Sequence, residues 1–333
     1  MLLLPLAAFA ATSDVHIASI GDLKLESGQT IRDCRIGYRT AGTLNAAKSN
    51  AVLFPTWFSG SSADLMQFMA ADGLVDPARY YAIAVDALGD GVSSSPSNST
   101  EQPRMQFPKF TIRDMVNAEY KLAHDVLGIP HLRAVMGISM GGMQTFEWVV
   151  DYPGFMDKAV PIVGSPRLTA TDLLLWSAEA DGIAESAGWN NGNYDRPPAL
   201  GAVGGIQEFA LTTPAYRARE TSRAQFPALL RHIEEKPLGR MDANDWLRQL
   251  QAMISLDVSK PFDGSLDRAA HAVKAKLLVV PSLQDHMVNP GPAMEFANDI
   301  GAPMVTLESD CGHLAPGCES KTLYPRVRAF LDQ

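Results

Sequence analysis

LRAVMGISMGGMQTFEWVVD, residues 132–151, joins a short apolar run, a serine between glycines and a helix-like segment. Residues 132–138 have the length and apolar character of a buried strand, and residues 141–152 repeat apolar side chains at helical spacing. Between them, residues 137–141 read G-x-S-x-G, with glycines where a sharp turn brings backbone segments together. The pattern predicts that Ser139 is held exposed at the carboxyl end of a strand, as a nucleophile must be.

Apolar runs of the same kind alternate with helical stretches on both sides of this segment. The expected strands are 34–41, 51–55, 80–86, 158–163, 276–281 and 303–307, and a helix is expected at 111–127. Buried strands alternating with helices predict a mostly parallel sheet flanked by helices.

The strand pattern stops between residues 165 and 272, where apolar positions fit helices and the loops are rich in Asn, Gly and Pro. Because strands resume afterwards, we interpret 165–272 as a helical lid inserted into one core, made of 12–164 and 273–333. A separate domain is the weaker reading.

A serine nucleophile needs a base, and the base needs an acid that orients it. Of the seven histidines, His313 alone follows a late strand near the C-terminus, and Asp285 lies four residues beyond the strand that ends at 281. The order Ser139, Asp285, His313 is that of α/β hydrolases. The sequence therefore predicts an α/β-hydrolase fold with these three residues as its catalytic triad.

Three other residues could in principle act as the base or the orienting acid. His286 adjoins Asp285, but adjacent residues do not easily form an Asp–His–Ser line. Asp310 is too close in sequence to His313 to reach its far ring nitrogen comfortably, and Asp257 falls in the lid. We therefore favour Asp285 and His313.

Acyl transfer also needs donors for the oxyanion of the tetrahedral intermediate. The expected donors are the backbone N–H groups of Met140, directly after the serine, and of Phe58, in the turn after the strand 51–55. Trp57 and Phe58 would narrow the part of the pocket that holds the acyl group, so a small acyl group is expected. Simple core packing is the alternative for Trp57.

The composition of the chain excludes some classes of binding partner. The chain has 333 residues, is 46% hydrophobic and carries a formal charge of −9, from 28 basic and 37 acidic residues. No run of Lys and Arg follows residue 13 that could track phosphates. Nucleic acid and anionic membrane surfaces are therefore not expected partners, and a small-molecule ester is.

The first eleven residues, MLLLPLAAFAA, are entirely apolar. They are too short for a membrane-spanning helix and are typical of the apolar region of a secretory signal, with Ala8-Phe9-Ala10 as a cleavage site. No Lys or Arg precedes them, so a truncated start or another kind of apolar tail stays open. We expect export to the periplasm or medium, with a cytoplasmic location as the alternative.

Cys311 and Cys318 flank His313, seven residues apart. In an oxidising compartment they could form a disulfide that holds the histidine segment, and two free thiols are the alternative. A metal site is not expected, because two thiolates and one histidine lack a fourth ligand at a recognisable spacing.

Several motifs together resemble the homoserine O-acetyltransferase superfamily of α/β hydrolases. They are YRTAGTLN at 38–45, SMGGMQ at 139–144, Glu147-Trp148, Tyr152-Pro153, DANDWL at 242–247 and Gly312-His313. The resemblance covers nearly the whole chain beyond residue 20. It implies the same triad and oxyanion donors, no metal or organic cofactor, and a homodimer formed through the lid.

This superfamily includes acetyltransferases that use acetyl-CoA and homoserine, and esterases that pass the acyl group to water. The transferases carry an Asp directly after the catalytic histidine, which helps to hold the substrate's amino group, whereas this chain has Leu314. Two further features favour hydrolysis: the turn at 56–62 is more aromatic than that of the transferases, and an exported protein would have no acetyl-CoA. We therefore expect an ester hydrolase in which Trp57 and Leu314 contact the substrate.

The alternatives are an acetyl-CoA-dependent O-acetyltransferase and a catalytically silent binding protein. A transferase would use Arg217 or Arg219 to bind a substrate carboxylate, although either could be a surface charge.

Overall fold

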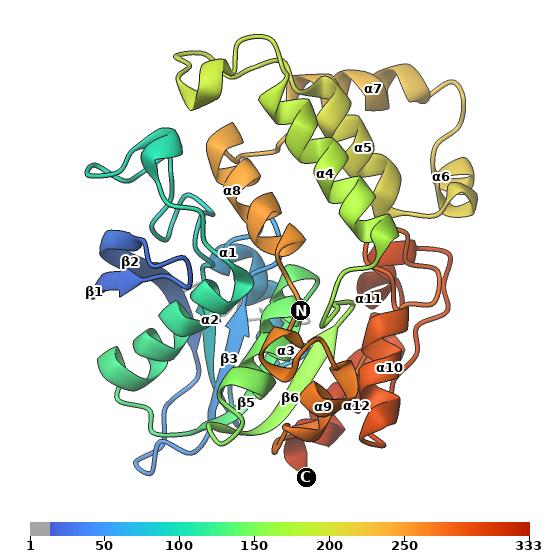
Figure 1. The fold of residues 1–333 in the computed structure, drawn as a ribbon. Helices are drawn as coiled ribbons and strands as arrows, with labels where there is room; N and C mark the ends of the chain where they lie inside the picture. The colour runs from blue at the N-terminus through green and yellow to red at the C-terminus, as the bar shows by residue number, and fades with distance from the viewer. Residues whose placement is uncertain (1–13) are drawn as a thin grey trace, which may run out of the picture.

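The computed structural model describes residues 14–333, so the expected signal segment 1–11 lies outside the described residues. A seven-stranded sheet forms the centre, in the order β1-β2-β4-β3-β5-β6-β7 (Figure 1). The pairs β1–β2 and β2–β4 are antiparallel, and all other neighbours are parallel, so the predicted mostly parallel sheet is confirmed. The strands are β1 His16–Lys24, β2 Thr30–Ala41, β3 Ala51–Pro55, β4 Tyr81–Val85, β5 Leu132–Ile138, β6 Met156–Ile162 and β7 Lys276–Leu277.

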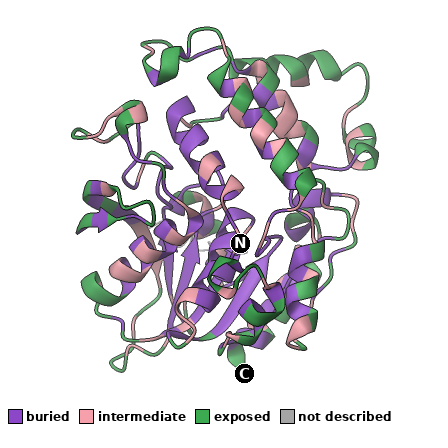
Figure 2. Cartoon of the chain, in the orientation of Figure 1, coloured by how far each residue is buried: buried purple, intermediate pink, exposed green. Residues whose placement is uncertain are grey.

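Both faces of the central strands are covered. Leu53 of β3 and Val135 of β5 belong to an apolar core that also contains side chains of α2 and α3. Val52 and Ala134, one residue earlier on the same strands, belong to a second core with side chains of α1 and α12. Figure 2 shows the central strands mostly buried, whereas β1 and β2 at the edge carry exposed residues. Burial on both faces explains why β3 reads AVLFP, without the polar alternation of a half-exposed strand.

The helices around the sheet are α1 Ser62–Leu65, α2 Ile112–Lys121, α3 Met140–Asp151, α9 Leu266–His271, α10 Gly291–Asp299, α11 Ala315–Cys318 and α12 Ser320–Asp332. Helix α2 begins at a capping box, in which the Thr111 hydroxyl accepts the Asp114 N–H at 3.1 Å. The regular helix ends at Lys121, earlier than predicted, because a wider π-helical turn occupies Leu122–Val126. Within residues 14–333, no helix combines the length and the apolar character that crossing a bilayer requires.

Of the six α-helices between β6 and β7, the first five form a layer beyond the carboxyl ends of the strands (Figure 1). They are α4 Ala170–Ala184, α5 Gly201–Leu211, α6 Pro214–Glu220, α7 Phe226–Glu235 and α8 Ala243–Ile254, and we call them the lid. Helix α8 is almost entirely buried between the other lid helices and the core, whereas α7 has no buried residue (Figure 2).

The two ends of the sheet differ from the sequence prediction. The strand β1 was not predicted; it is an edge strand with more exposed than buried residues, so its apolar signal is weak. At the other end, β7 covers only Lys276–Leu277, and single bridges such as Val279 to Met304 replace the predicted strands 276–281 and 303–307. Pro281 and Pro303 lack an amide hydrogen, which prevents a continuous ladder there.

Candidate active site

Ser139 sits in a sharp turn between β5 and α3. Its backbone has φ 58° and ψ −121°, a conformation that non-glycine residues rarely adopt. Its N–H donates to the carbonyl of Ile162 at 2.9 Å, which fixes the turn to the end of β6. A Cβ at Gly137 would lie 2.2 Å from the carbonyl carbon of Gly141, so the strand can meet the helix only with glycine at that position.

A hydrogen-bonded line runs from Ser139 through His313 to Asp285. His313 Nε2 is 2.8 Å from Ser139 Oγ, and His313 Nδ1 is 2.7 Å from Asp285 Oδ2. The side chains of His313 and Asp285 are only 6% and 1% exposed, so little water competes for these bonds. The fold thus brings together three residues separated by up to 174 positions in the chain.

The backbone orients Asp285. Its Oδ1 accepts the N–H groups of Met287 at 2.8 Å and Val288 at 3.0 Å, which leaves Oδ2 for the histidine. These two donors follow Asp285 directly, and sequence reasoning did not identify them. They hold the carboxylate in a fixed direction.

The competing residues lie outside this line. His286 is exposed, and the Asp310 carboxylate pairs with Arg219 of α6. Asp257 accepts a hydrogen bond from the backbone N–H of Ser259 at 3.0 Å. The geometry therefore selects Asp285 and His313 over them.

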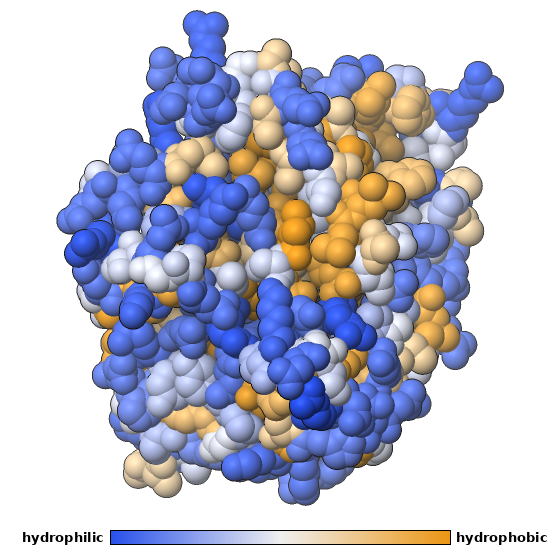
Figure 3. Space-filling view, viewed as in Figure 1, coloured by the Kyte–Doolittle hydropathy of each residue, from blue (hydrophilic) through white to orange (hydrophobic). Residues whose placement is uncertain are grey.

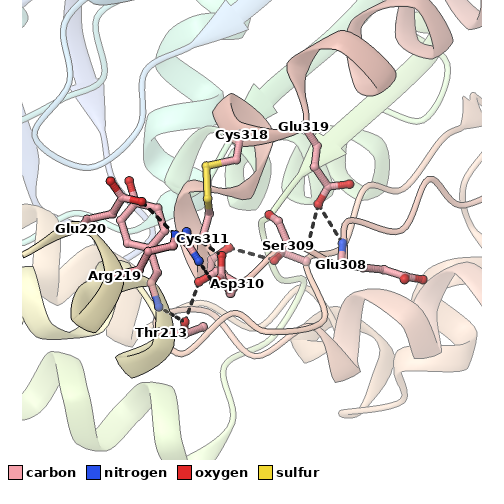
Figure 4. Close-up of a disulfide and its surroundings, with 12 residues drawn as sticks. Thr213, Arg219, Glu220, Glu308, Ser309, Asp310, Cys311, Cys318 and Glu319 are labelled. Atoms are coloured by element: carbon pink, nitrogen blue, oxygen red, sulfur yellow. Dashed lines mark hydrogen bonds and ion pairs between the residues drawn. A yellow bond between two sulfur atoms is a disulfide. The ribbon is translucent and has the colours of Figure 1, made fainter.

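The segment that carries His313 is held at several points. Cys311 and Cys318 are joined by a disulfide that encloses the histidine turn (Figure 4). The Thr213 hydroxyl donates to the carbonyl of Asp310 at 2.6 Å, and the Ser282 hydroxyl donates to the carbonyl of Gly312 at 2.8 Å. The lid and the core thus both contact the histidine segment.

Arg217 and Arg219 are already paired within the protein. Arg219 binds Asp310 (Figure 4). Its guanidinium also lies 5.2 Å from the centre of the Tyr216 ring, and Arg217 binds Glu208. Neither arginine lines the cavity in front of Ser139. The structure therefore does not support the alternative in which one of them binds a substrate carboxylate.

That cavity has a volume of about 530 Å³ and lies between the lid and the carboxyl edge of the sheet. Both predicted substrate contacts line it, with Leu314 43% exposed, and so do Phe58, Ser139 and His313. The other lining residues are Ser59, Gln67, Phe68, Ile138, Trp176, Gln207, Leu211, Tyr216, Met287, Pro316, Gly317 and Cys318. None of these described lining residues is Asp, Glu, Lys or Arg. A second hollow, of about 620 Å³, lies beside β7 and contains none of the predicted site residues.

The sequence did not identify which lid residues reach the cavity. Trp176, Gln207, Leu211 and Tyr216 come from α4, α5 and α6. Their spacing also fits ordinary helix packing. Only the position of the lid over the sheet distinguishes them from residues that pack within the lid.

The turn after β3 carries Phe58, one of the two expected oxyanion donors. The Phe58 side chain is 5% exposed and packs against two lid tryptophans, with ring centroids 4.4 Å from Trp246 and 5.9 Å from Trp176. Met140, the other expected donor, is the first residue of α3 and is fully buried.

A buried carboxyl group supports this aromatic cluster. Glu179 of α4 is fully buried, and the Trp246 indole N–H donates to it at 3.2 Å. Burial raises the pKa of Glu179 to about 8, because the charged form loses its hydration. The neutral carboxyl is therefore the form that fits beside Trp246 at neutral pH.

Comparisons with known proteins agree with this fold. A family model described as alpha/beta hydrolase fold matches residues 51–316. A probable esterase of Corynebacterium glutamicum is 33% identical over 325 residues, which cover 93% of this chain and 92% of that protein. An ethyl acetate hydrolase of Pseudomonas veronii is 32% identical over 284 residues, covering 81% and 80%.

Homoserine O-acetyltransferases are also similar to this chain. A homoserine O-acetyltransferase of Zymomonas mobilis is 28% identical over 366 aligned positions, covering 95% of this chain and 96% of that protein. Among solved structures, an acetylester hydrolase from Corynebacterium glutamicum superposes with a TM-score of 0.88 at 31% identity, covering 96% of this chain and 95% of that one. The chain therefore belongs to the α/β-hydrolase fold family, and its relatives include both esterases and homoserine O-acetyltransferases.

Proposed function

We propose that the protein is a carboxylic ester hydrolase that acts on small acyl esters through an acyl-serine intermediate. The observation that carries this proposal is the buried line in which Asp285 orients His313 and His313 contacts the Ser139 hydroxyl. This arrangement supplies a nucleophile, a general base and an orienting carboxylate.

In the first half of the reaction, His313 Nε2 removes the proton of Ser139 Oγ as the oxygen attacks the ester carbonyl. The N–H groups of Met140 and Phe58 stabilise the negative charge that develops on the carbonyl oxygen. His313 then gives its proton to the alcohol oxygen, the carbon–oxygen bond of the ester breaks, and the acyl group remains on Ser139.

In the second half, His313 takes a proton from a water molecule, whose oxygen attacks the acyl-serine. The second tetrahedral intermediate collapses, Ser139 Oγ leaves with the proton held by His313, and the acid departs. No metal or organic cofactor enters these steps.

The walls of the cavity favour water or a neutral alcohol over an amino acid as the acyl acceptor. Leu314 occupies the position where the transferases that the chain resembles carry an Asp, and a leucine cannot pair with an ammonium group. A charge-assisted hydrogen bond in a desolvated site contributes about 1–3 kcal/mol, so homoserine would bind less well here. The esterase relatives support the same choice.

Aromatic side chains limit the acyl group. Trp57 and Phe68 line the cavity and contact each other edge to face, with ring centroids 6.1 Å apart. Phe58 is fixed between the two lid tryptophans. Because such packed rings yield little, acetyl-type esters should be turned over faster than long-chain esters.

The test uses p-nitrophenyl acetate, and then acetyl-CoA with homoserine. Ester turnover that is lost in Ser139→Ala and in His313→Ala supports the proposal. His286→Ala, an exposed histidine beside Asp285, is the matched control and should keep its activity. Release of CoA that depends on homoserine would instead identify a transferase, and no turnover of either substrate would leave a binding protein.

A homodimer through the lid also belongs to this proposal. Leu174 of α4 and Phe209 of α5 are 73% and 78% exposed, and Phe226 of α7 is 52% exposed. Figure 3 shows apolar side chains gathered over the lid near α4 and α5. Light scattering should give the mass of a dimer, and Phe209→Asp should give the mass of a monomer.

Export is the remaining part of the proposal. The apolar segment 1–11 and the disulfide between Cys311 and Cys318 support an oxidising compartment. N-terminal sequencing of the protein recovered from periplasm or medium should begin after Ala10 or Ala11. Recovery of the full-length chain from the cytoplasm would contradict export.

A further inference from the structure

Two buried glutamines contact the turn that follows β3. Gln144 of α3 donates from Nε2 to the carbonyls of Thr56 at 3.0 Å and Met140 at 3.2 Å. Its side-chain amide therefore links the turn after β3 to the first residue after the proposed nucleophile. Gln144 is fully buried, so this link is shielded from water.

Gln249 holds the other side of the same turn. It projects from α8 of the lid, accepts the Ser59 N–H at 3.2 Å and donates to the carbonyl of Leu88 at 3.1 Å. Three residues earlier on the same helix, Trp246 packs against the Phe58 ring. One face of α8 thus contacts both the backbone and the side chain of the turn.

The two expected oxyanion donors lie far apart in the sequence. Met140 is at the start of α3, whereas Phe58 is in the turn between β3 and α1, so no short stretch of chain fixes the distance between their N–H groups. An oxyanion hole works only when its donors are already placed for the transition state. Gln144 donates to a carbonyl in each of the two segments, Thr56 and Met140. Gln249 holds Ser59, the residue after Phe58.

The environment of Gln144 argues against simple core filling. Its amide oxygen is buried and has no hydrogen-bond partner within residues 14–333. An unpaired buried polar atom is unfavourable, and a methionine of similar length would fill the same space without it. The two carbonyl contacts of the amide nitrogen are what a methionine could not provide.

We propose that Gln144 and Gln249 are positioning residues for the oxyanion hole, which set the spacing between the N–H groups of Met140 and Phe58. This inference rests on the proposed function. It also implies that α8 of the lid is part of the catalytic architecture, because displacement of α8 would release the turn that carries Phe58.

The test compares Gln144→Met and Gln249→Met with Thr145→Val. Thr145 is a matched control, because it is fully buried on the same helix and its hydroxyl donates only to the carbonyl of Gly141, at 2.8 Å. For p-nitrophenyl acetate, each methionine variant should lose about 10- to 100-fold in kcat, less than or similar to the loss of a whole oxyanion donor, with KM nearly unchanged. The control should keep its kcat.

A second readout separates positioning from stability and from the choice of ester. The affinity for an alkyl boronic acid, which forms a tetrahedral adduct on a serine, should fall in both methionine variants by about the same factor as kcat. Thermal unfolding shows whether each variant is folded, and either glutamine can carry the test if the other variant is not.

Two folded methionine variants that keep the wild-type kcat and boronate affinity would overturn the inference and leave the proposed function intact. If wild type binds the boronic acid but hydrolyses no ester, the proposed function fails. The boronate affinities of the variants then still decide the roles of Gln144 and Gln249.

Discussion

Removing the disulfide between Cys311 and Cys318 should lower stability moderately and weaken catalysis slightly. The bridge closes a loop with a sequence separation of 7 residues. By lowering the conformational entropy of the unfolded chain, a loop of that length stabilises the folded state by about 2.5 kcal/mol. For a chain of 333 residues, that corresponds to a fall of about 4 °C in the unfolding midpoint.

The catalytic effect should be smaller than the position of His313 alone would suggest. The contacts of Thr213 with Asp310 and of Ser282 with Gly312 remain when the bridge is absent. We therefore expect kcat for p-nitrophenyl acetate to fall roughly tenfold or less, because a larger loss would require a displacement of about 1 Å.

The assay compares the double variant Cys311→Ser and Cys318→Ser with wild type, each with and without a thiol reductant. Reductant should lower the midpoint of wild type but not that of the double variant. Cys34→Ser is the matched control, because Cys34 is a buried free cysteine, and this variant should respond to reductant as wild type does. An intact mass that does not rise by two hydrogens on reduction would show that the bridge is absent, and equal midpoints with and without reductant would show that it does not stabilise the fold.

Three further predictions follow from the site. Asp285→Asn should lower kcat by roughly 10⁴-fold with little change in KM, because the amide would hold His313 in the wrong tautomer; steady-state kinetics that show less than a tenfold loss would contradict this role. Leu314→Asp should raise the ratio of acyl transfer to hydrolysis with homoserine by roughly tenfold, through one new charge-assisted hydrogen bond; product analysis showing an unchanged ratio would remove Leu314 as a determinant. Burial raises the pKa of Glu179 in the folded state to about 8, above the ordinary value of 4.5 for a glutamate, so its contribution to stability is full below pH 4.5 and is lost as pH rises towards 8. Glu179→Gln should make the free energy of unfolding less dependent on pH across this window, and denaturant titrations that show the same slope as wild type would contradict the assignment.

The local sequence predicted the central part of the fold because its signals are local. The run at 132–138 is buried on both faces, and Gly137 is required by the backbone of Gly141, four residues later. Gly141 is also required by the carbonyl of Pro55, which only the fold brings near. Asp285 and His313 were identified from their order and their positions after strands, which the topology of the sheet converts into proximity.

The remaining features depend on contacts between distant segments. No local signal shows that Gln249 of the lid meets Ser59, or that Arg219 meets Asp310. The predicted strand 276–281 is shortened to β7 in the structure, although Leu278 and Val280 still donate to carbonyls of β6. Residues whose role is set by the position of the lid could only be found from the structure.

The decisive experiment traps the acyl group on Ser139. Wild-type protein is mixed with p-nitrophenyl acetate, quenched in acid within the first turnover, digested and examined by peptide mass spectrometry. We expect one acetyl group on the peptide that contains Ser139 and none in Ser139→Ala. In His313→Ala the label should be strongly reduced at the same time point, because His313 is needed to deprotonate Ser139. Rapid release of p-nitrophenol with no acetyl group on Ser139, or with the label on another residue, would contradict it.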